Sequence, residues 1–262
     1  MLKRRLIPVL YIKNGLIVRS ESFNYHQNIG NVVNEAQRYN QWNVDELIYI
    51  DISRESGYDL RRDDMKVKSL STIAAILDAI AKVCFMPLTF GGGIRTVDQV
   101  DVLVRGGADK ITLNTGAVED PGLIRRIAEK YGSQCVVVSI DYRLMDGRAT
   151  VFTHFGTANT NIELTEWMRT CEEFGAGEFL LNAIDRDGKA DGYDLSTLAH
   201  AAEATRLPVI GCGGAGDDFD FVDLARQTSV SGLGAGNFFH FTELSYPRVK
   251  RLLSQEGIDV RP

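Results

Sequence analysis

The stretch LTFGGGIRTVDQVDVLVRGGADKITLNT, Leu88–Thr115, decides how this chain folds. An apolar run ends in Gly91–Gly93, an amphipathic run follows, and a second apolar run ends in Asn114-Thr115. This order predicts a strand, a glycine turn, a helix, a second strand and a polar turn, which together make a βαβ unit. Glycines let a backbone come close to a ligand, and the amides at a helix start attract an anion. A glycine run alone is more often a simple tight turn, so a phosphate site needs a second signal.

The second signal lies in the other half of the chain. VIGCGGAG, Val209–Gly216, is again an apolar run that ends in glycines, and Asn237 follows the next apolar run as Asn114 follows the first. Gly91 and Gly213 are 122 positions apart (213 − 91), and the two asparagines are 123 apart (237 − 114). Two similar halves built from βα units predict a closed (β/α)8 barrel, the TIM barrel, made of two half-barrels.

Length and composition agree with this fold. The chain has 262 residues, and a (β/α)8 barrel typically takes about 250. Hydrophobic residues make up 44% and charged residues 24%, which is ordinary for a protein with a buried core. No linker or low-complexity segment divides the chain, so we predict one domain over residues 1–262. The net charge of −6 provides no general attraction to nucleic acid or to an anionic membrane, and we expect neither as a partner.

Metal, cofactor and targeting signals are missing from the sequence. The four cysteines are far apart and form no CxxC pair, and the four histidines show no metal-ligand spacing. We therefore expect no metal ion, no organic cofactor and no disulfide framework. The first residues reach a proline and a lysine too soon for a signal peptide, and no apolar run approaches the ~20 residues of a membrane helix. These features predict a cytoplasmic protein.

Hydrophobic patterning predicts the individual elements. Strands are expected at 6–12, 46–51, 86–90, 110–113, 135–142, 178–183, 208–212 and 230–235. Helices are expected at 32–42, up to 83, at 97–105, from Pro121, and at 162–174, 194–204, 217–227 and 243–255. Residues 13–30 are expected to form a long loop, residues 53–64 a charged loop, and residues 146–157 a short hairpin.

Barrel enzymes place their chemistry at the C-terminal ends of the strands. Here these ends carry Tyr11, Asp51, Asp141, Asn182 and the two glycine turns. Glycine turns at equivalent places in both halves suit a phosphorylated small molecule with a phosphate at each end. The alternative, that all of them are only turn glycines, is less favoured because both halves repeat the same pattern.

Many ordered stretches of the chain resemble the cyclase subunit family of imidazole glycerol phosphate synthase over nearly the whole length. They are RLIPVL, DELIYIDIS, GGGIRTV, GADKITLNT, YGSQCVVVSID, VFTH, GAGEFLL, IDRDGKADGYDL, PVIGCGGAG and FFHF. The resemblance implies a (β/α)8 barrel docked on a glutaminase subunit. It also implies that ammonia released there passes along the barrel axis to the C-terminal face.

The family's functional residues carry over only in part. In the family, two aspartates at the ends of the first and fifth strands act as acid and base on a bisphosphorylated ribosyl substrate. Asp141 matches the second aspartate, whereas Tyr11 stands at the position of the first. The resemblance also assigns two phosphate-binding sets, one of Gly93, Asn114 and Thr115 and the other of Gly188, Gly214, Ala215 and Asn237.

The departures from the family decide between functions. A tyrosine, with a pKa near 10, cannot replace a carboxylate as a base at neutral pH, and losing one acid–base group costs about 10² to 10⁴ in rate. Arg19 replaces a lysine, and Asn182, Cys212 and Asn237 replace small hydroxyl residues. We interpret Cys212 as a packing residue rather than a nucleophile, because no histidine lies near it in sequence.

Several of these departures resemble a paralogous branch of the family. IPVL without the aspartate, CFMPL before the glycines, LLNAIDRDG and IGCGGAG are similar to barrels that accompany sugar amidotransferases of bacterial surface-polysaccharide (O-antigen) synthesis. The resemblance implies that the barrel passes ammonia from the glutaminase to a third protein, a sugar amidotransferase. That protein converts an N-acetyl group to an acetamidino group.

The opposite face supports ammonia conduction. The family has a gate of four charged residues at the barrel floor, and all four match here, as Arg5, Glu46, Lys110 and Glu178. Even spacings from Arg5 to Tyr11, from Lys110 to Asn114 and from Glu178 to Asn182 put each pair on one side of its strand. The alternative is four ordinary hydrophilic residues at strand starts. Asp109 matches a residue that the family uses at the glutaminase contact.

Two hypotheses from different classes follow. The first is an ammonia-conducting subunit of a glutamine-dependent amidotransferase complex with little cyclase activity. The second is an authentic cyclase, a lyase of histidine biosynthesis, that uses Asp141 and a substitute acid. A third and weaker one is a barrel with a different phosphosugar substrate. Tyr11 favours the first.

Overall fold

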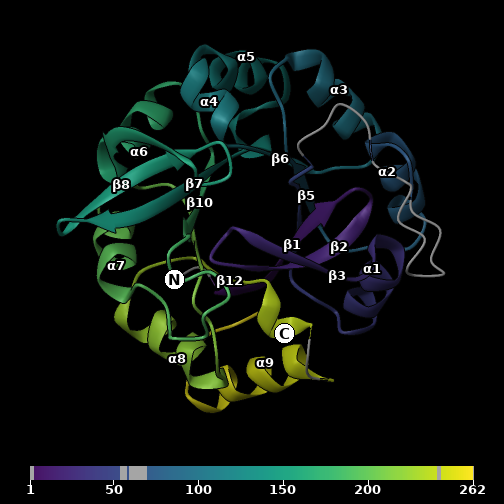
Figure 1. Cartoon of the computed structure of the whole chain (residues 1–262). Helices are drawn as coiled ribbons and strands as arrows, with labels where there is room; N and C mark the ends of the chain where they lie inside the picture. Colours follow the sequence, from purple (N-terminus) through teal and green to yellow (C-terminus); the bar gives the residue numbers. More distant parts are fainter. Residues whose placement is uncertain (1–2, 54–57, 59–69, 241–242, 262) are drawn as a thin grey trace.

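Eight parallel strands close into a barrel with the helices outside it, which confirms the predicted (β/α)8 fold (Figure 1). The computed structural model describes residues 3–53, 58, 70–240 and 243–261. Strand order around the barrel follows the chain, and β1 closes it by pairing with both β4 and β12. The barrel strands are β1 (Arg5–Lys13), β4 (Leu47–Asp51), β5 (Leu88–Gly91), β6 (Lys110–Leu113), β7 (Val136–Met145), β10 (Glu178–Ala183), β11 (Val209–Cys212) and β12 (Gly232–Ala235).

The helices begin close to where the sequence predicts them, because most carry a side-chain cap. Asn31, Thr72, Thr96, Asp194 and Asp217 each accept a hydrogen bond from the first turn of the helix that follows. The helices are α1 (Val32–Gln41), α2 (Ile73–Ala81), α3 (Val97–Arg105), α4 (Thr115–Glu119), α5 (Gly122–Tyr131), α6 (Leu164–Glu173), α7 (Leu195–Glu203), α8 (Asp218–Gln227) and α9 (Ser245–Gln255). The short α4 and the 3₁₀ turns η1 (Ser133–Cys135) and η2 (Asn237–Phe239) were not predicted.

The expectation of a long loop at residues 13–30 is wrong. These residues form an antiparallel hairpin, β2 (Leu16–Glu21) and β3 (Tyr25–Asn31), that continues β1. The turn between β1 and β2 is Asn14-Gly15, with φ of 52° and 76°. An Asn-Gly pair with two positive φ angles is the preferred two-residue hairpin turn, so the missed signal was present in the sequence.

The second half repeats this device. The turn after β7 is Asp146-Gly147, with φ of 50° and 77°, and it joins β7 to β8 (Arg148–Thr153). The predicted hairpin at 146–157 is therefore present, and a third strand, β9 (Ala158–Glu163), extends it. The first and the fifth strands of the barrel both continue into an antiparallel hairpin, which agrees with two similar half-barrels.

The barrel interior is lined in layers by residues of alternate position along the strands. One layer inside the barrel is an apolar cluster that is separate from the main core. It is formed by Ile7, Val9, Ile48, Val137, Leu180, Ile210 and Cys212. The main core lies between the sheet and the helices. The charged loop expected at 53–64 falls almost entirely outside the described residues. None of the helices in the described part of the chain has the length and apolar character to cross a membrane.

Candidate functional site

Asp141 lies at the upper face of the barrel, which is the face at the C-terminal ends of the barrel strands. It lies on β7 and is 5% exposed. Its carboxylate accepts hydrogen bonds from Asn182 Nδ2 at 3.0 Å and from Asn114 Nδ2 at 2.9 Å. Burial raises the pKa of Asp141 to about 6, although both amides favour the ionised form. The group can therefore give or take a proton close to neutral pH.

Tyr11 lies close to Asp141, at the position where the resemblance to the family expects the aspartate of the first strand. Its hydroxyl accepts a hydrogen bond from Asn182 Nδ2 at 3.3 Å, and its ring packs edge-on against Phe23 with 5.4 Å between centroids. Burial raises the pKa of Tyr11 well above its ordinary value. The hydroxyl keeps its proton at neutral pH, so Tyr11 cannot act as the base that a carboxylate would be.

Two cavities open on the upper face, one in each half of the barrel. The larger has a volume of about 590 Å³ and the smaller a volume of about 100 Å³. Tyr11 and Cys212 line both cavities. Burial raises the pKa of Cys212 to about 12, which keeps it a thiol and agrees with a packing role.

The predicted phosphate residues of the first half surround the smaller cavity. Gly93, Asn114 and Thr115 all line it. A side chain at the neighbouring Gly92 would meet the Asp51 carbonyl oxygen at 2.1 Å, and its φ is 115°, so the turn requires glycine there. The Asp51 side chain accepts hydrogen bonds from Ser53 N and from the Tyr58 hydroxyl, so it positions these two residues.

The predicted phosphate residues of the second half line the larger cavity, and they are Gly188, Gly214, Ala215 and Asn237. The start of α8 beside them is already occupied by two carboxylates of the chain. Asp220 accepts from the amides of Gly216 and Asp217, and Asp217 accepts from those of Phe219 and Asp220. An anion bound here would therefore depend on the amides of the four predicted residues rather than on this helix end.

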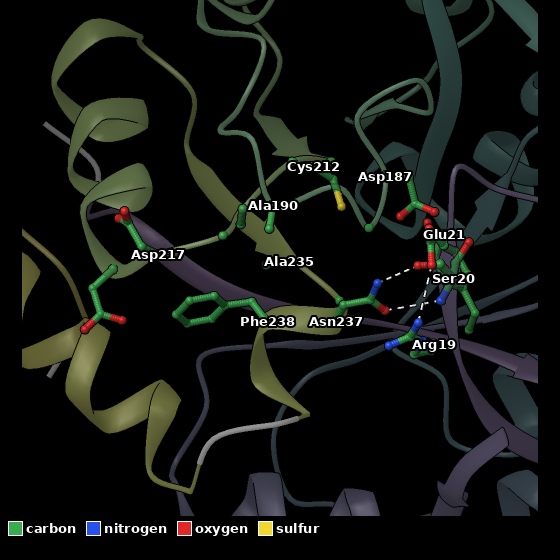
Figure 2. Close-up of a pocket in the computed structure, with 18 of the residues that line it drawn as sticks. Arg19, Ser20, Glu21, Asp187, Ala190, Cys212, Asp217, Ala235, Asn237 and Phe238 are labelled. Carbon is green, nitrogen blue, oxygen red and sulfur yellow. Dashed lines mark hydrogen bonds and ion pairs between the residues drawn. The ribbon is translucent and has the colours of Figure 1, made fainter. Parts of the chain in front are cut away.

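The β2–β3 hairpin is fastened over the larger cavity. Asn237 and the Ser20 backbone exchange two hydrogen bonds, with Asn237 Nδ2 to Ser20 O at 2.5 Å and Ser20 N to Asn237 Oδ1 at 3.2 Å (Figure 2). Asp187 accepts from the amides of Ser22 and Phe23, at 2.7 Å and 3.1 Å. Sequence reasoning missed these hairpin and Asp187 contacts, for which the only signal was the acidic glycine turn at 185–188.

The four predicted gate residues form a closed ring at the barrel floor. Arg5 bridges Glu46 at 2.7 Å and Glu178 at 2.5 Å. Lys110 bridges the same two glutamates at 2.9 Å and 2.7 Å. Thr89 donates a further hydrogen bond to Glu46 at 3.1 Å. All four charges face the interior, which the even strand spacings predict for Arg5, Lys110 and Glu178.

The ion pairs within the ring offset the cost of burying its charges. The side chains of Glu46 and Glu178 are 3% and 5% exposed, and Lys110 is 23% exposed. Burial opposes ionisation of Glu46, but Lys110 and Arg5 outweigh it and hold its pKa below the ordinary value. Burial likewise opposes the charge on Arg5, and Glu178 and Glu46 together raise its pKa. Each charge is therefore stable only while its partners are in place.

The floor also carries the predicted glutaminase contact. The Asp109 carboxylate accepts a hydrogen bond from Leu88 N at 2.8 Å, so it also fixes the start of β5. Phe85, 80% exposed, lines the same surface cavity as Asp109. Sequence reasoning did not single out Phe85. In residues 3–53, 58, 70–240 and 243–261, no three histidine, cysteine or acidic side chains lie close enough to hold a metal ion.

Comparisons with known proteins agree with this geometry. A family model described as "Histidine biosynthesis protein" matches residues 5–245. Imidazole glycerol phosphate synthase subunit HisF of Natranaerobius thermophilus is 38% identical over 261 residues, with 100% of both chains covered. The subunit of the same name from Chlorobium luteolum is 40% identical over 261 residues, again with 100% of both covered. That of Staphylococcus carnosus is 38% identical over 264 residues, covering 100% of this chain and 99% of the relative. The chain therefore belongs to the histidine biosynthesis protein family and is a HisF-like subunit of the imidazole glycerol phosphate synthase type.

Proposed function

We propose that this barrel receives ammonia from a HisH-like glutaminase subunit and conducts it to the upper face, with little cyclase activity of its own. One observation carries the proposal: the ion-pair ring at the floor is complete, whereas Tyr11 replaces one of the two carboxylates at the top. A chain that keeps the entrance and loses half of the acid–base pair is suited to conduct rather than to cyclise.

The interior supports passage of ammonia in its neutral form. Above the ring, the inward side chains of Ile7, Ile48, Val137 and Leu180 make an apolar layer. An ion would lose its hydration there without compensation, whereas neutral ammonia has no charge to desolvate. Among the described residues, the ring is the only strongly charged barrier at the entrance below this layer. Its opening would control the entry of ammonia.

The acceptor of the ammonia is the finer part of the proposal. The resemblance to the polysaccharide branch favours a sugar amidotransferase that turns an N-acetyl group into an acetamidino group. In that arrangement the nitrogen leaves this barrel at the upper face and the new C–N bond forms on the third protein. The predicted phosphate turns then serve a regulatory or vestigial anion, or the sugar itself.

The authentic cyclase remains the second candidate, and two observations favour it. The relatives compared above are named imidazole glycerol phosphate synthase subunit HisF, and none of those names refers to a sugar amidotransferase. The pKa of Asp141, about 6, also suits a proton-transfer group. On names alone the cyclase is favoured over the polysaccharide role, and Tyr11 is the observation against it.

A turnover assay separates the two candidates. The purified protein is given the bisphosphorylated cyclase substrate and ammonium salt, beside an authentic cyclase. We expect turnover about 10² to 10⁴ below the authentic enzyme, because one acid–base group is missing. Tyr11→Asp should raise the rate, while Tyr25→Asp, at a site 61% exposed, should leave it unchanged. Turnover at ordinary cyclase rates would rule out the proposed loss of cyclase activity and support the second candidate.

A further inference from the structure

Asn182 has one polar atom that the protein leaves unused. Its NH₂ group donates to Asp141 and to the Tyr11 hydroxyl. A carboxylate accepts only from a donor, so Asp141 fixes which end of the amide faces it. The carbonyl oxygen must then point away. Within the described residues, Asn182 Oδ1 is buried and has no hydrogen-bond partner.

A second unused atom lies on β6, which is separated by β7 from β10, the strand of Asn182. Thr112 Oγ1 is likewise buried and without a partner among the described residues. Asn182 is 3% exposed, Thr112 is 3% exposed, and Ser139 beside them is 7% exposed. All three line the cavity of about 100 Å³ together with Asp141. Buried polar atoms without partners cost free energy, so such a cluster indicates a ligand that supplies the missing hydrogen atoms.

The chemistry of the cluster selects the kind of ligand. The carbonyl of Asn182 and the carboxylate of Asp141 are acceptors, and the hydroxyls of Thr112 and Ser139 can accept as well. This end of the cavity therefore repels an anion. An anion would instead bind to the backbone amides at the rim of the cavity, around Gly93 and Thr115. A small donor with several N–H groups fits both the acceptors and the volume.

We propose that Asn182, Thr112, Ser139 and Asp141 form a binding site for ammonium at the upper end of the barrel interior. Ammonium would donate its N–H groups to these acceptors, and neutral ammonia emerging from the apolar layer would donate up to three hydrogen bonds to the same atoms. The physiological meaning of the site rests on the proposed conduction of ammonia. Binding itself does not depend on which acceptor consumes the nitrogen.

Rubidium, an ammonium-sized ion with a strong anomalous signal, is the probe. Crystals grown without ammonium at pH 7.5 are soaked in a series of rubidium chloride concentrations, and occupancy is followed from anomalous difference density. We expect a peak within contact distance of Asn182 Oδ1 and Asp141. Excess ammonium chloride should displace it, and equal sodium chloride should not. A water only, or displacement by sodium as readily as by ammonium, would overturn the proposal.

Variants test which atoms make the site. Thr112→Val keeps the side-chain shape and removes the hydroxyl, and Asn182→Leu removes the carbonyl. Each should weaken ammonium binding about tenfold or more, because a hydrogen bond from a charged group is lost, and rubidium binding should weaken as well, because an oxygen atom that contacts the cation is lost. Tyr11→Phe is the matched control, since it removes only the hydroxyl that Asn182 donates to, and it should retain binding. Equal loss in all three variants would overturn the assignment.

The result also stays distinct from that of the cyclase assay. Specific ammonium binding together with ordinary cyclase turnover would support the site and refute the proposed function. Low turnover with no ammonium-selective peak would do the reverse.

Discussion

At the residue scale, the side chains of Tyr11 and Asp141 decide between an ammonia-conducting subunit and an authentic cyclase. The sequence alone shows that Tyr11 replaces a carboxylate and that Asp141 remains, because both lie in recognisable strands. It cannot show that Asp141 titrates near pH 6 or that Asn182 holds it, since both depend on burial by strands far apart in the chain. The unused carbonyl of Asn182 is hidden for the same reason.

Asp141 should make stability depend on pH. Its pKa rises from the ordinary 3.8 to about 6 on folding, so the folded state binds the proton more tightly. The contribution of Asp141 to stability is then greatest below pH 3.8, falls as the pH rises to 6, and stays lowered above it. The rise corresponds to about 3 kcal/mol. For Asp141→Asn, we expect the free energy of unfolding relative to the original protein to increase by about this amount between pH 3.5 and pH 7.5. Denaturant titrations at both pH values measure it, and a pH-independent difference would show that Asp141 is not perturbed.

At the scale of secondary-structure elements, the sequence can predict the hairpin turns but not the contacts that hold the β2–β3 hairpin in place. Asn14-Gly15 and Asp146-Gly147 specify two-residue hairpin turns, and the first of these was overlooked in favour of a loop. That the β2–β3 hairpin lies over the larger cavity follows from contacts with Asn237 and Asp187, which are more than 150 residues away in sequence. No local pattern predicts such contacts.

Removing the fastening should free the hairpin. Asn237→Ala leaves the amide and the carbonyl of Ser20 without their partner, a loss of about 1 to 3 kcal/mol. We expect hydrogen–deuterium exchange across residues 16–31 to accelerate about tenfold or more, while β10 and β11 stay protected. Asn34→Ala, on the exposed face of α1, is the control and should leave the hairpin unchanged. Unaltered exchange in Asn237→Ala would mean that other contacts hold the hairpin closed.

At the scale of the whole molecule, the two ends of the barrel differ: the floor carries a ring of four charged side chains, and the upper face carries Tyr11 beside Asp141. The repeat of glycine turns and asparagines predicts the closed barrel and its two halves, because the repeat does not depend on the exact bounds of any single strand or helix. The same reasoning aligned three of the four floor charges with the interior, and the structure joins all four into one ring.

The most direct test of ammonia conduction is a competition between two nitrogen sources in one reaction. The complex of this subunit with its glutaminase and its acceptor is given glutamine labelled with ¹⁵N in the amide, together with unlabelled ammonium. The readout is the ¹⁵N fraction of the product, whether an amidated sugar or an imidazole. Lys110→Ala breaks two ion pairs of the ring, and Lys130→Ala, which loses one ion pair and one aromatic contact at an exposed site, is the control. We predict mostly ¹⁵N product for the original protein and for Lys130→Ala, and a fall toward the ratio of free ammonia for Lys110→Ala. An unchanged ¹⁵N fraction in Lys110→Ala, or free mixing of both sources in the original protein, would contradict conduction through this barrel.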